Sequence, residues 1–360
     1  MARERIVSAD SHVSIQDEAV LGHLASRYHD DYKAARLAFM KKMAARMKKK
    51  PGAPSMMPSQ DQPWEAAGRP GESDPVARLE DMDIDQVDAE VLYTDVMVGE
   101  AYYDLAPQAR VACFQAYNDA ALQFASYDPK RLLPVYIAPI ADIDESVREV
   151  TRLAKAGARA ILLPLYPVDM GRPHYSDKLY DPLWSCFQEV GIPISQHVSA
   201  NQHLLDIMVY DSTPAKGIFQ SLPPIFMAEV LASWIVPGIL ARFPDLKVVL
   251  VESGLGWIPY FLERLDTMKR SHGWDHYGML PELPSTYFRR QMFCTFEEDT
   301  FGVSQRHRIG VENLMWATDY PHPDSTWPNS QKVLETHFSD VPVEEARLMI
   351  GGNAASLYGL

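Results

Sequence analysis

The chain has 360 residues, 47% of them hydrophobic, and a formal net charge of -14 at pH 7. A surface this acidic repels phosphate backbones, so we do not expect nucleic acid as a partner. The sequence shows no secretory leader and no run near the roughly 20 apolar residues that a membrane span needs, so we expect a cytoplasmic protein without membrane contact.

Short apolar runs alternate with helical patterns along the chain. This alternation is typical of βα units, and near-continuous apolar runs such as KVVLVE indicate strands buried on both faces of a parallel sheet. The expected strands are Ile6–Asp10, Ala89–Tyr93, Leu133–Ala138, Ala160–Pro164, Ile192–His197, Lys247–Glu252, Met292–Phe296 and Leu314–Asp319. Eight such units predict a single-domain (β/α)8 TIM barrel spanning residues 1–360.

Helical patterns fill most of the intervals between these strands. The expected helices are Gln108–Tyr127, Ile143–Ala156, Pro182–Val190, Phe226–Phe243 and Trp257–Lys269. Asp142 and Asp181 stand where helix N-caps usually stand. The cysteines are three in number and far apart, so we expect buried free thiols: Cys113, Cys186 and Cys294.

Residues 16–87 interrupt the alternation of strands and helices. The segment is helical in pattern up to about Lys50 and continues as a stretch rich in Pro, Gly, Ser and Met. A loop this long inside a compact domain is usually functional or disordered. Because it follows the first strand of a barrel, it would hang over the catalytic face. We therefore predict that residues 16–87 form a lid or cap within the barrel domain.

A basic run, KKMAARMKKK, lies in this insertion at residues 41–50. One interpretation is a solvated helix end whose cations complement the helix dipole. The other is a segment that guides an anionic substrate, such as a carboxylate or an acyl-CoA, beneath the lid. The neighbouring Met56, Met57 and Trp64 would give that lid an apolar and adaptable underside, suited to a bulky acyl or aromatic group.

Ionisable side chains terminate four of the expected apolar strands. Asp10 ends the first strand, and His12 follows two residues later on the same side of an extended chain. His197 ends the fifth strand, Glu252 the sixth and Asp319 the eighth. Active sites of barrels are built at the carboxyl ends of the strands, so we predict that these five side chains converge.

Two imidazoles with two or three carboxylates are typical ligands of Zn²⁺, Fe²⁺ and Mn²⁺. We predict one or two divalent metal ions bound by Asp10, His12, His197, Asp319 and Glu252. Such an ion can polarise a carbonyl group and lower the pKa of bound water toward ~7. The structural alternative is a set of core histidines and turn-forming aspartates without a metal.

Four motifs carry a resemblance to a known family: SADSHV, ISQHVS, WATDYPH and the closing GGNAASLYGL. Apart from residues 16–75, almost the whole chain resembles the amidohydrolase superfamily. Within it, the sequence is similar to the amidohydrolase-2 group, which includes aminocarboxymuconate-semialdehyde decarboxylase and γ-resorcylate decarboxylase. The resemblance implies metal ligands at Asp10, His12, His197 and Asp319, and it implies a homodimer because oligomers are common in the family.

The sequence departs from the decarboxylases of this group at two points. They carry His-x-His or Glu-x-His at the first motif, where this chain has Asp10-x-His12, and a catalytic His after the sixth strand, where it has Glu252. A carboxylate there suits a general base toward metal-bound water. The sequence therefore favours a metal-dependent hydrolase of a carboxylic ester, a thioester such as an acyl-CoA, or an amide. Asp319 or Glu252 would accept the proton of water, with His322 supporting Asp319 or binding substrate.

Two other functions stay open on the sequence. The first is non-oxidative decarboxylation of an aromatic or unsaturated carboxylic acid, with an acidic group protonating carbon. The second is a catalytically inactive barrel that binds a ligand, suggested by Glu252 in place of His. In every case the expected partner is a small-molecule carboxylic acid derivative.

Several further residues are candidates for substrate contacts. His203 lies in the insertion after the fifth strand and suits a substrate or a second metal. Trp257 and Tyr320 lie near strand ends and either line the pocket or are ordinary core aromatics. Glu297 and Asp299 follow the seventh strand, where they are either polar pocket residues or the acidic start of a helix.

Overall fold

The computed structural model describes residues 5–46, 66, 68–94, 98–199, 217–218, 220–272 and 276–360. Among those residues, no helix combines the length and the apolar character that a bilayer crossing requires. Several predictions lie outside the described residues. They concern Lys48, Lys49 and Lys50, the lid residues Met56, Met57 and Trp64, and the substrate candidate His203.

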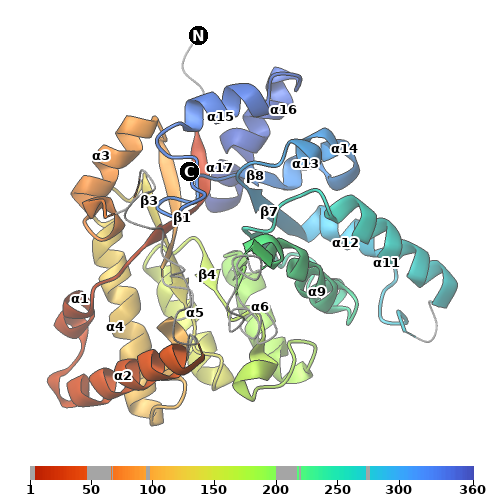
Figure 1. The fold of residues 1–360 in the computed structure, drawn as a ribbon. Coiled ribbons are helices and arrows are strands. Elements are labelled where there is room, and N and C mark those ends of the chain that lie inside the picture. Colours follow the sequence, from red (N-terminus) through yellow and green to blue (C-terminus); the bar gives the residue numbers. More distant parts are fainter. Residues whose placement is uncertain are drawn as a thin grey trace.

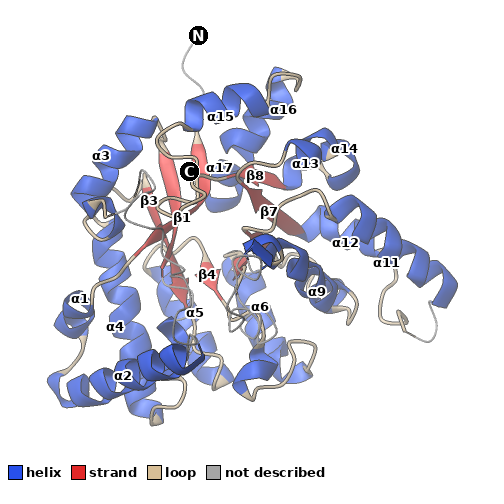
Figure 2. Cartoon of the chain, in the orientation of Figure 1, coloured by secondary structure: helices blue, strands red, loops and turns tan. Residues whose placement is uncertain are grey.

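Eight parallel strands form one sheet in the chain order β1 to β8, with helices around it (Figures 1 and 2). The strands are β1 (Val7–Val13), β2 (Ala89–Thr94), β3 (Leu132–Ile137), β4 (Ile161–Leu162), β5 (Ile194–His197), β6 (Val248–Val251), β7 (Met292–Phe296) and β8 (Leu314–Trp316). The ends of the sheet also meet, because Asp319 N–H donates to the carbonyl of Asp10 at 3.0 Å. The predicted (β/α)8 barrel is confirmed, and it is nearly closed.

The strands differ from their predicted bounds where the candidate ligands lie. β1 continues to Val13, so Asp10 and His12 lie inside the strand and not at its end. The register with β2 shifts between Ser8 and Ser11, which is a bulge, and bulges re-aim side chains next to active sites. β8 in turn ends at Trp316, so Asp319 belongs to the loop that follows. The pattern of apolar residues could not show either shift, because the bulge and the loop residues are as buried as the strands.

The barrel helices occupy the intervals between the strands (Figure 1). They are α1 (Asp17–His23), α2 (His29–Arg46), α3 (Pro75–Asp85), α4 (Pro107–Ala125), α5 (Ile143–Lys155), α6 (Asp181–Val190), α9 (Pro223–Ile235), α10 (Ile239–Arg242), α11 (Ile258–His272), α12 (Pro284–Gln291), α13 (Thr300–Ser304), α14 (Arg306–Ile309), α15 (Ser330–His337), α16 (Val343–Arg347) and α17 (Asn353–Tyr358). A π-helical turn, Leu348–Gly352, joins the last two.

Local chemistry explains where these helices begin and end. Asp142 caps α5 as predicted, accepting from Glu145 N–H at 3.0 Å. Asp181 is instead the first residue of α6, and the N-cap is Tyr180. The predicted helix Phe226–Phe243 is two helices, because Pro237 lacks an N–H and Gly238 adopts a left-handed conformation with φ 77°.

The strands and the inner faces of the helices form one large apolar core. The cysteines are buried and free, as predicted: Cys113, Cys186 and Cys294. A small polar layer crosses the interior beside β1, where the hydroxyls of Ser8, Ser11 and Thr318 lie within 3.1 Å of one another. This layer satisfies hydroxyl groups where the first and last strands meet, below the candidate ligands.

The loop after β8 is joined to α3 by a buried carboxylate. Asp85 accepts from Ser330 N–H at 3.0 Å and from the Ser330 hydroxyl at 2.5 Å, at the start of α15. Burial raises the pKa of Asp85 to about 6, although the two hydrogen bonds from Ser330 oppose that rise. The charged carboxylate is therefore less favourable in the native state than in the unfolded chain, and this part of the stability is lost as pH rises from about 4 to about 6.

We predict that Asp85→Asn removes this pH dependence. The rise from the reference pKa of 3.8 to about 6 corresponds to about 3 kcal/mol. The free energy of unfolding of the unmodified protein, minus that of Asp85→Asn, should fall by that amount between about pH 4 and pH 7. Urea unfolding of the metal-free proteins measures it. Asp83→Asn, an exposed aspartate of the same helix, is the control, and its effect should stay below about 1 kcal/mol at each pH. A constant difference for Asp85→Asn would contradict the prediction.

Candidate metal centre

The structure brings together the five side chains that were predicted to bind metal. His12 Nε2 lies 3.3 Å from His197 Nε2 and 3.1 Å from Asp319 Oδ1. His197 Nε2 lies 3.6 Å from Asp10 Oδ1 and 3.8 Å from Glu252 Oε2. Two overlapping groups, Asp10–His12–His197–Glu252 and His12–Glu252–Asp319–His322, each have ligand atoms within 4.8 Å of one another. Residues from β1, β5 and the loops after β6 and β8 thus face one point.

The backbone aims these side chains at their common point. Glu252 directly follows β6 and Asp319 follows β8 by three residues, and both have a left-handed φ of 54°. Non-glycine residues seldom adopt this conformation, and it is most often found at functional sites. His12 is fixed differently, because its N–H donates to the carbonyl of Tyr320 at 2.6 Å across the seam between β1 and the loop after β8.

Both histidines are held in the neutral form that binds metals. His197 Nδ1 lies 2.8 Å from the carbonyl of Val198, which only accepts, so Nδ1 carries the proton and Nε2 is left to coordinate. Burial lowers the pKa of His197, and burial together with the neighbouring His322 lowers the pKa of His12 to about 3. Neither imidazole therefore needs to lose a proton before binding a cation near neutral pH.

If ionised together, the carboxylates of the site would carry more negative charge than the described side chains around them balance. Asp10 is fully buried, and neither of its oxygens has a hydrogen-bond partner among the described residues. Burial and the charge of Asp319 raise the pKa of Asp10 and of Glu252 well above their usual values. Such groups are costly unless paired or coordinated to a metal. A divalent cation among two imidazole nitrogens and these oxygens would compensate them, so the residues fit the predicted metal.

His322 supplies positive charge at the mouth of the site. Its Nδ1 lies 2.9 Å from Asp319 Oδ2, and its ring centroid lies 4.1 Å from that of His12. Burial alone would lower the pKa of His322, but the hydrogen bond and the negative charge of Asp319 outweigh it and raise the pKa to about 9. The same contact opposes the effect of burial on Asp319, whose pKa is lowered by His12 and His322. Asp319 and His322 therefore form an ion pair beside the ligands.

Two further side chains adjoin the ligands. Glu297 follows β7, has one buried oxygen without a partner, and its pKa is raised by burial and by the charges of Asp319 and Asp10. Tyr93 of β2 packs its ring 5.0 Å from that of His197 and hydrogen-bonds Ser195 at 3.0 Å. The sequence left Glu297 ambiguous, and it gave no signal for Tyr93, because a tyrosine inside an apolar strand looks like ordinary core.

The structure shows what the two aromatic candidates contact, for which the sequence left pocket lining and core packing open. Tyr320 is buried, and its hydroxyl donates to Asp81 of α3 at 2.5 Å, so its side chain holds the loop after β8 against α3. Trp257 is half-buried, donates to the carbonyl of Ser253 at 2.7 Å and packs on Phe261. These contacts tie Trp257 to Ser253 in the loop after β6 and to Phe261 of α11.

Asp299 has the second of the two roles that the sequence left open, that of an acidic residue at the start of a helix. Its carboxylate accepts from the N–H groups of Leu255 and Gly256 at 2.7 and 2.9 Å, and from Gly302 N–H at 2.6 Å. It therefore caps α13 and holds the loop after β6 against it. Acidic residues are favourable at such helix starts.

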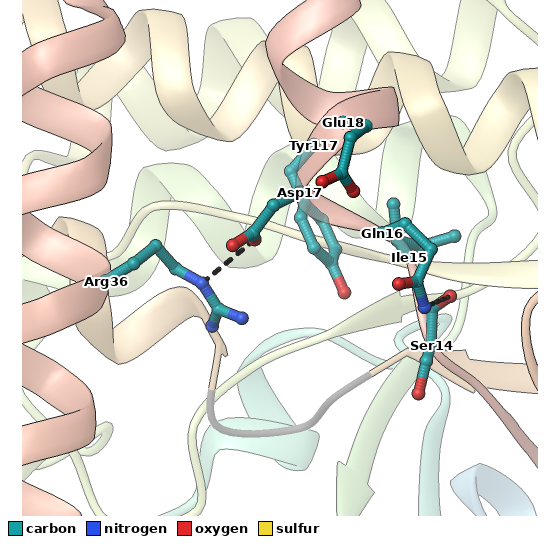
Figure 3. Close-up of a pocket in the computed structure, with 7 residues that line it drawn as sticks. All are labelled: Ser14, Ile15, Gln16, Asp17, Glu18, Arg36 and Tyr117. Carbon is teal, nitrogen blue, oxygen red and sulfur yellow. Dashed lines mark hydrogen bonds and ion pairs between the residues drawn. The ribbon is translucent and has the colours of Figure 1, made fainter.

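A polar cavity of about 390 Å³ opens directly after β1 (Figure 3). Its seven lining residues are Ser14, Ile15, Gln16, Asp17, Glu18, Arg36 and Tyr117. Arg36 of α2 pairs with Asp17 of α1 at 3.2 Å, and Figure 3 shows Tyr117 behind this pair. None of the lining residues is a candidate metal ligand, so the cavity adjoins the ligand-bearing strand without containing the metal centre.

Residues 10–360 match the amidohydrolase family model described as Amidohydro_2. The chain therefore belongs to the amidohydrolase family. A 2-amino-3-carboxymuconate-6-semialdehyde decarboxylase from Dictyostelium discoideum is 25% identical over 297 residues, which cover 80% of this chain and 77% of that protein.

Solved structures share the fold of the whole chain. An amidohydrolase from Mycobacterium avium subsp. paratuberculosis is 20% identical with a TM-score of 0.75, and the match covers 100% of both chains. A 5-carboxyvanillate decarboxylase from Novosphingobium aromaticivorans, solved with bound manganese and a nitrobenzoic acid, is 18% identical with a TM-score of 0.74. That match covers 99% of this chain and 97% of the other.

These comparisons overturn the preference for hydrolysis. The expectation of a metal-dependent hydrolase rested on Glu252 standing where the decarboxylases of the group carry a catalytic His. The curated relative is a decarboxylase, and the solved structures that share the fold include a 5-carboxyvanillate decarboxylase and a 2,6-dihydroxybenzoate decarboxylase. The replacement at one position therefore does not identify a hydrolase, and the sequence argument gave it too much weight.

We predict that His197→Ala and Asp10→Asn lose tight binding of a divalent metal. Each change removes a ligand atom from the cluster, so the loss of Mn²⁺ affinity should exceed the roughly 10–100-fold that removal of a supporting group costs. Mn²⁺ content after dialysis, measured by plasma mass spectrometry, reports it. His307→Ala removes an exposed histidine of α14 and is the matched control. Equal metal content in His197→Ala and the unmodified protein would contradict the assigned site.

Proposed function

We propose that this protein is a metal-dependent, non-oxidative decarboxylase of an aromatic or unsaturated carboxylic acid. The observation that carries the proposal is the cluster of Asp10, His12, His197, Glu252 and Asp319 around one point, together with the ion-paired His322 at its mouth. The curated decarboxylase relative supports the same reaction class. The bound manganese of the Novosphingobium enzyme makes Mn²⁺ the first metal to test, beside Zn²⁺ and Fe²⁺.

Asp10, His12, His197 and Asp319 would hold the cation, and Glu252 lies close enough to join them. When bound, a divalent cation would supply positive charge that attracts the substrate carboxylate and stabilises negative charge in the transition state. The neutral imidazoles would present their lone pairs to it, and the buried carboxylates would gain a counter-charge that the described side chains do not supply.

The chain itself supplies the proton that replaces the departing carboxyl group. The reaction breaks the carbon–carboxylate bond, releases CO₂ and forms a carbon–hydrogen bond, so it consumes one proton. Asp319 engages Nδ1 of His322 and favours the imidazolium, whose other nitrogen then has a proton to donate to substrate carbon. The His322 side chain is 42% exposed, so solvent can return the proton after each turnover.

This assignment would allow decarboxylation although Glu252 stands where the decarboxylases of the group carry a catalytic His. An acid is needed near the scissile carbon, but it need not come from the loop after β6. His322 approaches the cluster from the loop after β8, and Glu252 stays beside His197 at 3.8 Å. Glu252 would then orient His197 and add negative charge to the cation site.

The domain organisation is part of the same proposal. We infer a single barrel domain over residues 1–360, with residues 16–87 as a cap above the catalytic face. Within the described part of the insertion, α1 and α2 both contact α4 (Figure 1). A cytoplasmic homodimer is the assembly that we expect from the resemblance to the family.

We predict that the Mn²⁺-loaded protein releases CO₂ from aromatic acids that carry an oxygen beside the carboxylate. The panel would include 5-carboxyvanillate and 2,6-dihydroxybenzoate, with CO₂ followed in a coupled assay and the product identified by mass spectrometry. A chelator should abolish the release, and Mn²⁺ should restore it. Hydrolysis of esters and thioesters by the loaded protein, without CO₂ from any acid, would contradict the proposal.

We further predict that His322→Asn lowers kcat by about 100-fold or more, within the 10²–10⁴-fold range of general acid catalysis. Because the pKa of His322 is raised to about 9, the imidazolium persists through neutral pH, and kcat should fall as pH rises through that value. A bound cation disfavours the imidazolium, so the decline should begin no higher than about pH 9.

His174→Asn, in the loop after β4, is the control and should retain both kcat and its pH profile. Metal content is measured in parallel, to separate loss of acid from loss of the cation. A His322→Asn protein with full metal and unchanged kcat would exclude His322 as the acid.

A further inference from the structure

α3 contacts both ligand-bearing segments that meet at the seam of the barrel. It begins after the 3₁₀ turn Pro70–Glu72, and two of its buried charged side chains, Arg78 and Asp81, reach these segments, while the third, Asp85, bonds to Ser330. Neither side chain contacts a ligand atom of the proposed metal site. Arg78 contacts the backbone of His12, and Asp81 contacts Tyr320, which follows Asp319.

Arg78 holds the segment that carries His12. Its side chain is fully buried, and its Nε donates to Glu90 of β2 at 2.5 Å. Its Nη1 donates to the carbonyl of His12 at 2.7 Å and to that of Gly71 at 3.3 Å. A planar guanidinium can reach several acceptors with fixed geometry, which a flexible ammonium group cannot do. The carbonyl of His12 is thus fixed relative to β2 and to the 3₁₀ turn Pro70–Glu72.

Asp81 holds the segment that carries Asp319 and His322. It accepts the hydroxyl hydrogen of Tyr320, which directly follows Asp319, and it pairs with Arg69. The backbone carbonyl of Asp81 also accepts from Trp327 Nε1 at 3.0 Å. Two side chains of the loop after β8 therefore end on one residue of α3.

Tyr320 connects the two halves of this arrangement. The guanidinium of Arg78 lies 4.3 Å from the centroid of the Tyr320 ring, a cation–π distance. The carbonyl of Tyr320 accepts from His12 N–H at 2.6 Å. His12 is therefore held by its N–H to one segment and by its carbonyl to Arg78.

Gly71 packs so closely against α3 that a side chain at this position would not fit. A Cβ added to Gly71 would collide with the Asp81 carboxylate and would lie 3.2 Å from the backbone of Arg78. The chain leaving the insertion is therefore packed directly against both charged residues. Ala66, from the same stretch, is buried in one small cluster with Tyr320 and Trp327.

We propose that Arg78 and Asp81 are positioning residues of the metal centre, which act through the His12 backbone and through Tyr320 to set the spacing of His12 and Asp319. This inference rests on the metal-binding part of the proposed function. It assigns α3 to the active site, although none of its side chains is a ligand. It also makes the hydroxyl of Tyr320 part of the metal-binding apparatus.

The test measures Mn²⁺ affinity by competition with a fluorescent chelator, beside urea unfolding of the metal-free proteins. Tyr320→Phe deletes one hydroxyl and leaves every ligand in place, and it should weaken Mn²⁺ binding on the order of 10-fold. Arg78→Lys should weaken Mn²⁺ binding by a similar factor, because one ammonium group cannot replace the contacts of the guanidinium to both Glu90 and the His12 carbonyl.

Tyr287→Phe is the matched control. Tyr287 of α12 is also buried, its hydroxyl oxygen accepts from Glu282 N–H at 3.2 Å, and Arg290 lies 5.0 Å from its ring centroid. It should lose stability as Tyr320→Phe does and keep Mn²⁺ affinity within about 2-fold, since it lies outside the shell of groups that support the ligands.

The outcomes separate this inference from the proposed function. If the unmodified protein does not bind Mn²⁺, Zn²⁺ or Fe²⁺, the proposed function fails. If it binds Mn²⁺ and Tyr320→Phe binds with the same affinity, the positioning role is overturned while the metal site stands. Should Arg78→Lys fail to fold, Tyr320→Phe alone decides. Weaker Mn²⁺ binding by Tyr320→Phe with unchanged binding by Tyr287→Phe supports the positioning role.

Discussion

The constraint on which the site depends is the accumulation of negative charge in a place that water scarcely reaches. Asp10, Glu252, Glu297 and Asp319 lie close together, Asp10 inside β1 and the other three in the loops that follow β6, β7 and β8. Among the described side chains around them, His322 is the one whose pKa their charges raise above its usual value, whereas burial keeps the pKa values of His12 and His197 low. A cation with two charges is the simplest way to make this arrangement stable, because carboxylates without partners are costly when buried.

Local backbone geometry brings these carboxylates together. A bulge inside β1 places Asp10 and His12 on the cluster while the strand continues to Val13. Left-handed backbone at Glu252, directly after β6, and at Asp319, three residues after β8, turns two other side chains inward. Strained positions of this kind persist when the surrounding structure determines them, and at Asp319 the packing of α3 against the loop after β8 provides that support.

The sequence predicted the barrel and the convergence of the ligands for a physical reason. Buried parallel strands are continuous apolar runs, so an Asp or His at the end of a run is conspicuous, as at His197 and Asp319. The bulge at Asp10 left no such signal, and neither did the placement of Tyr320. An aromatic residue beside a ligand looks the same whether it faces a substrate or an interior carboxylate such as Asp81, because both environments are partly apolar.

The preference for hydrolysis shows a second limit of sequence reasoning. The sequence argument treats the absence of a histidine after β6 as the absence of a proton donor. A proton donor can, however, come from any loop that reaches the same place in the folded chain. His322 reaches the cluster from a different loop, and only the folded chain shows that its ring lies against that of His12.

The seam between β1 and the loop after β8 joins the twelfth residue of the chain to residues more than three hundred positions later. During synthesis, the early ligands emerge from the ribosome long before Asp319 exists. A nascent chain can therefore hold at most an incomplete set of donors, and a loosely bound cation can exchange until the last strand docks. If these residues bind a cation as proposed, its tight binding should coincide with the final closure of the barrel and hold the two edges together.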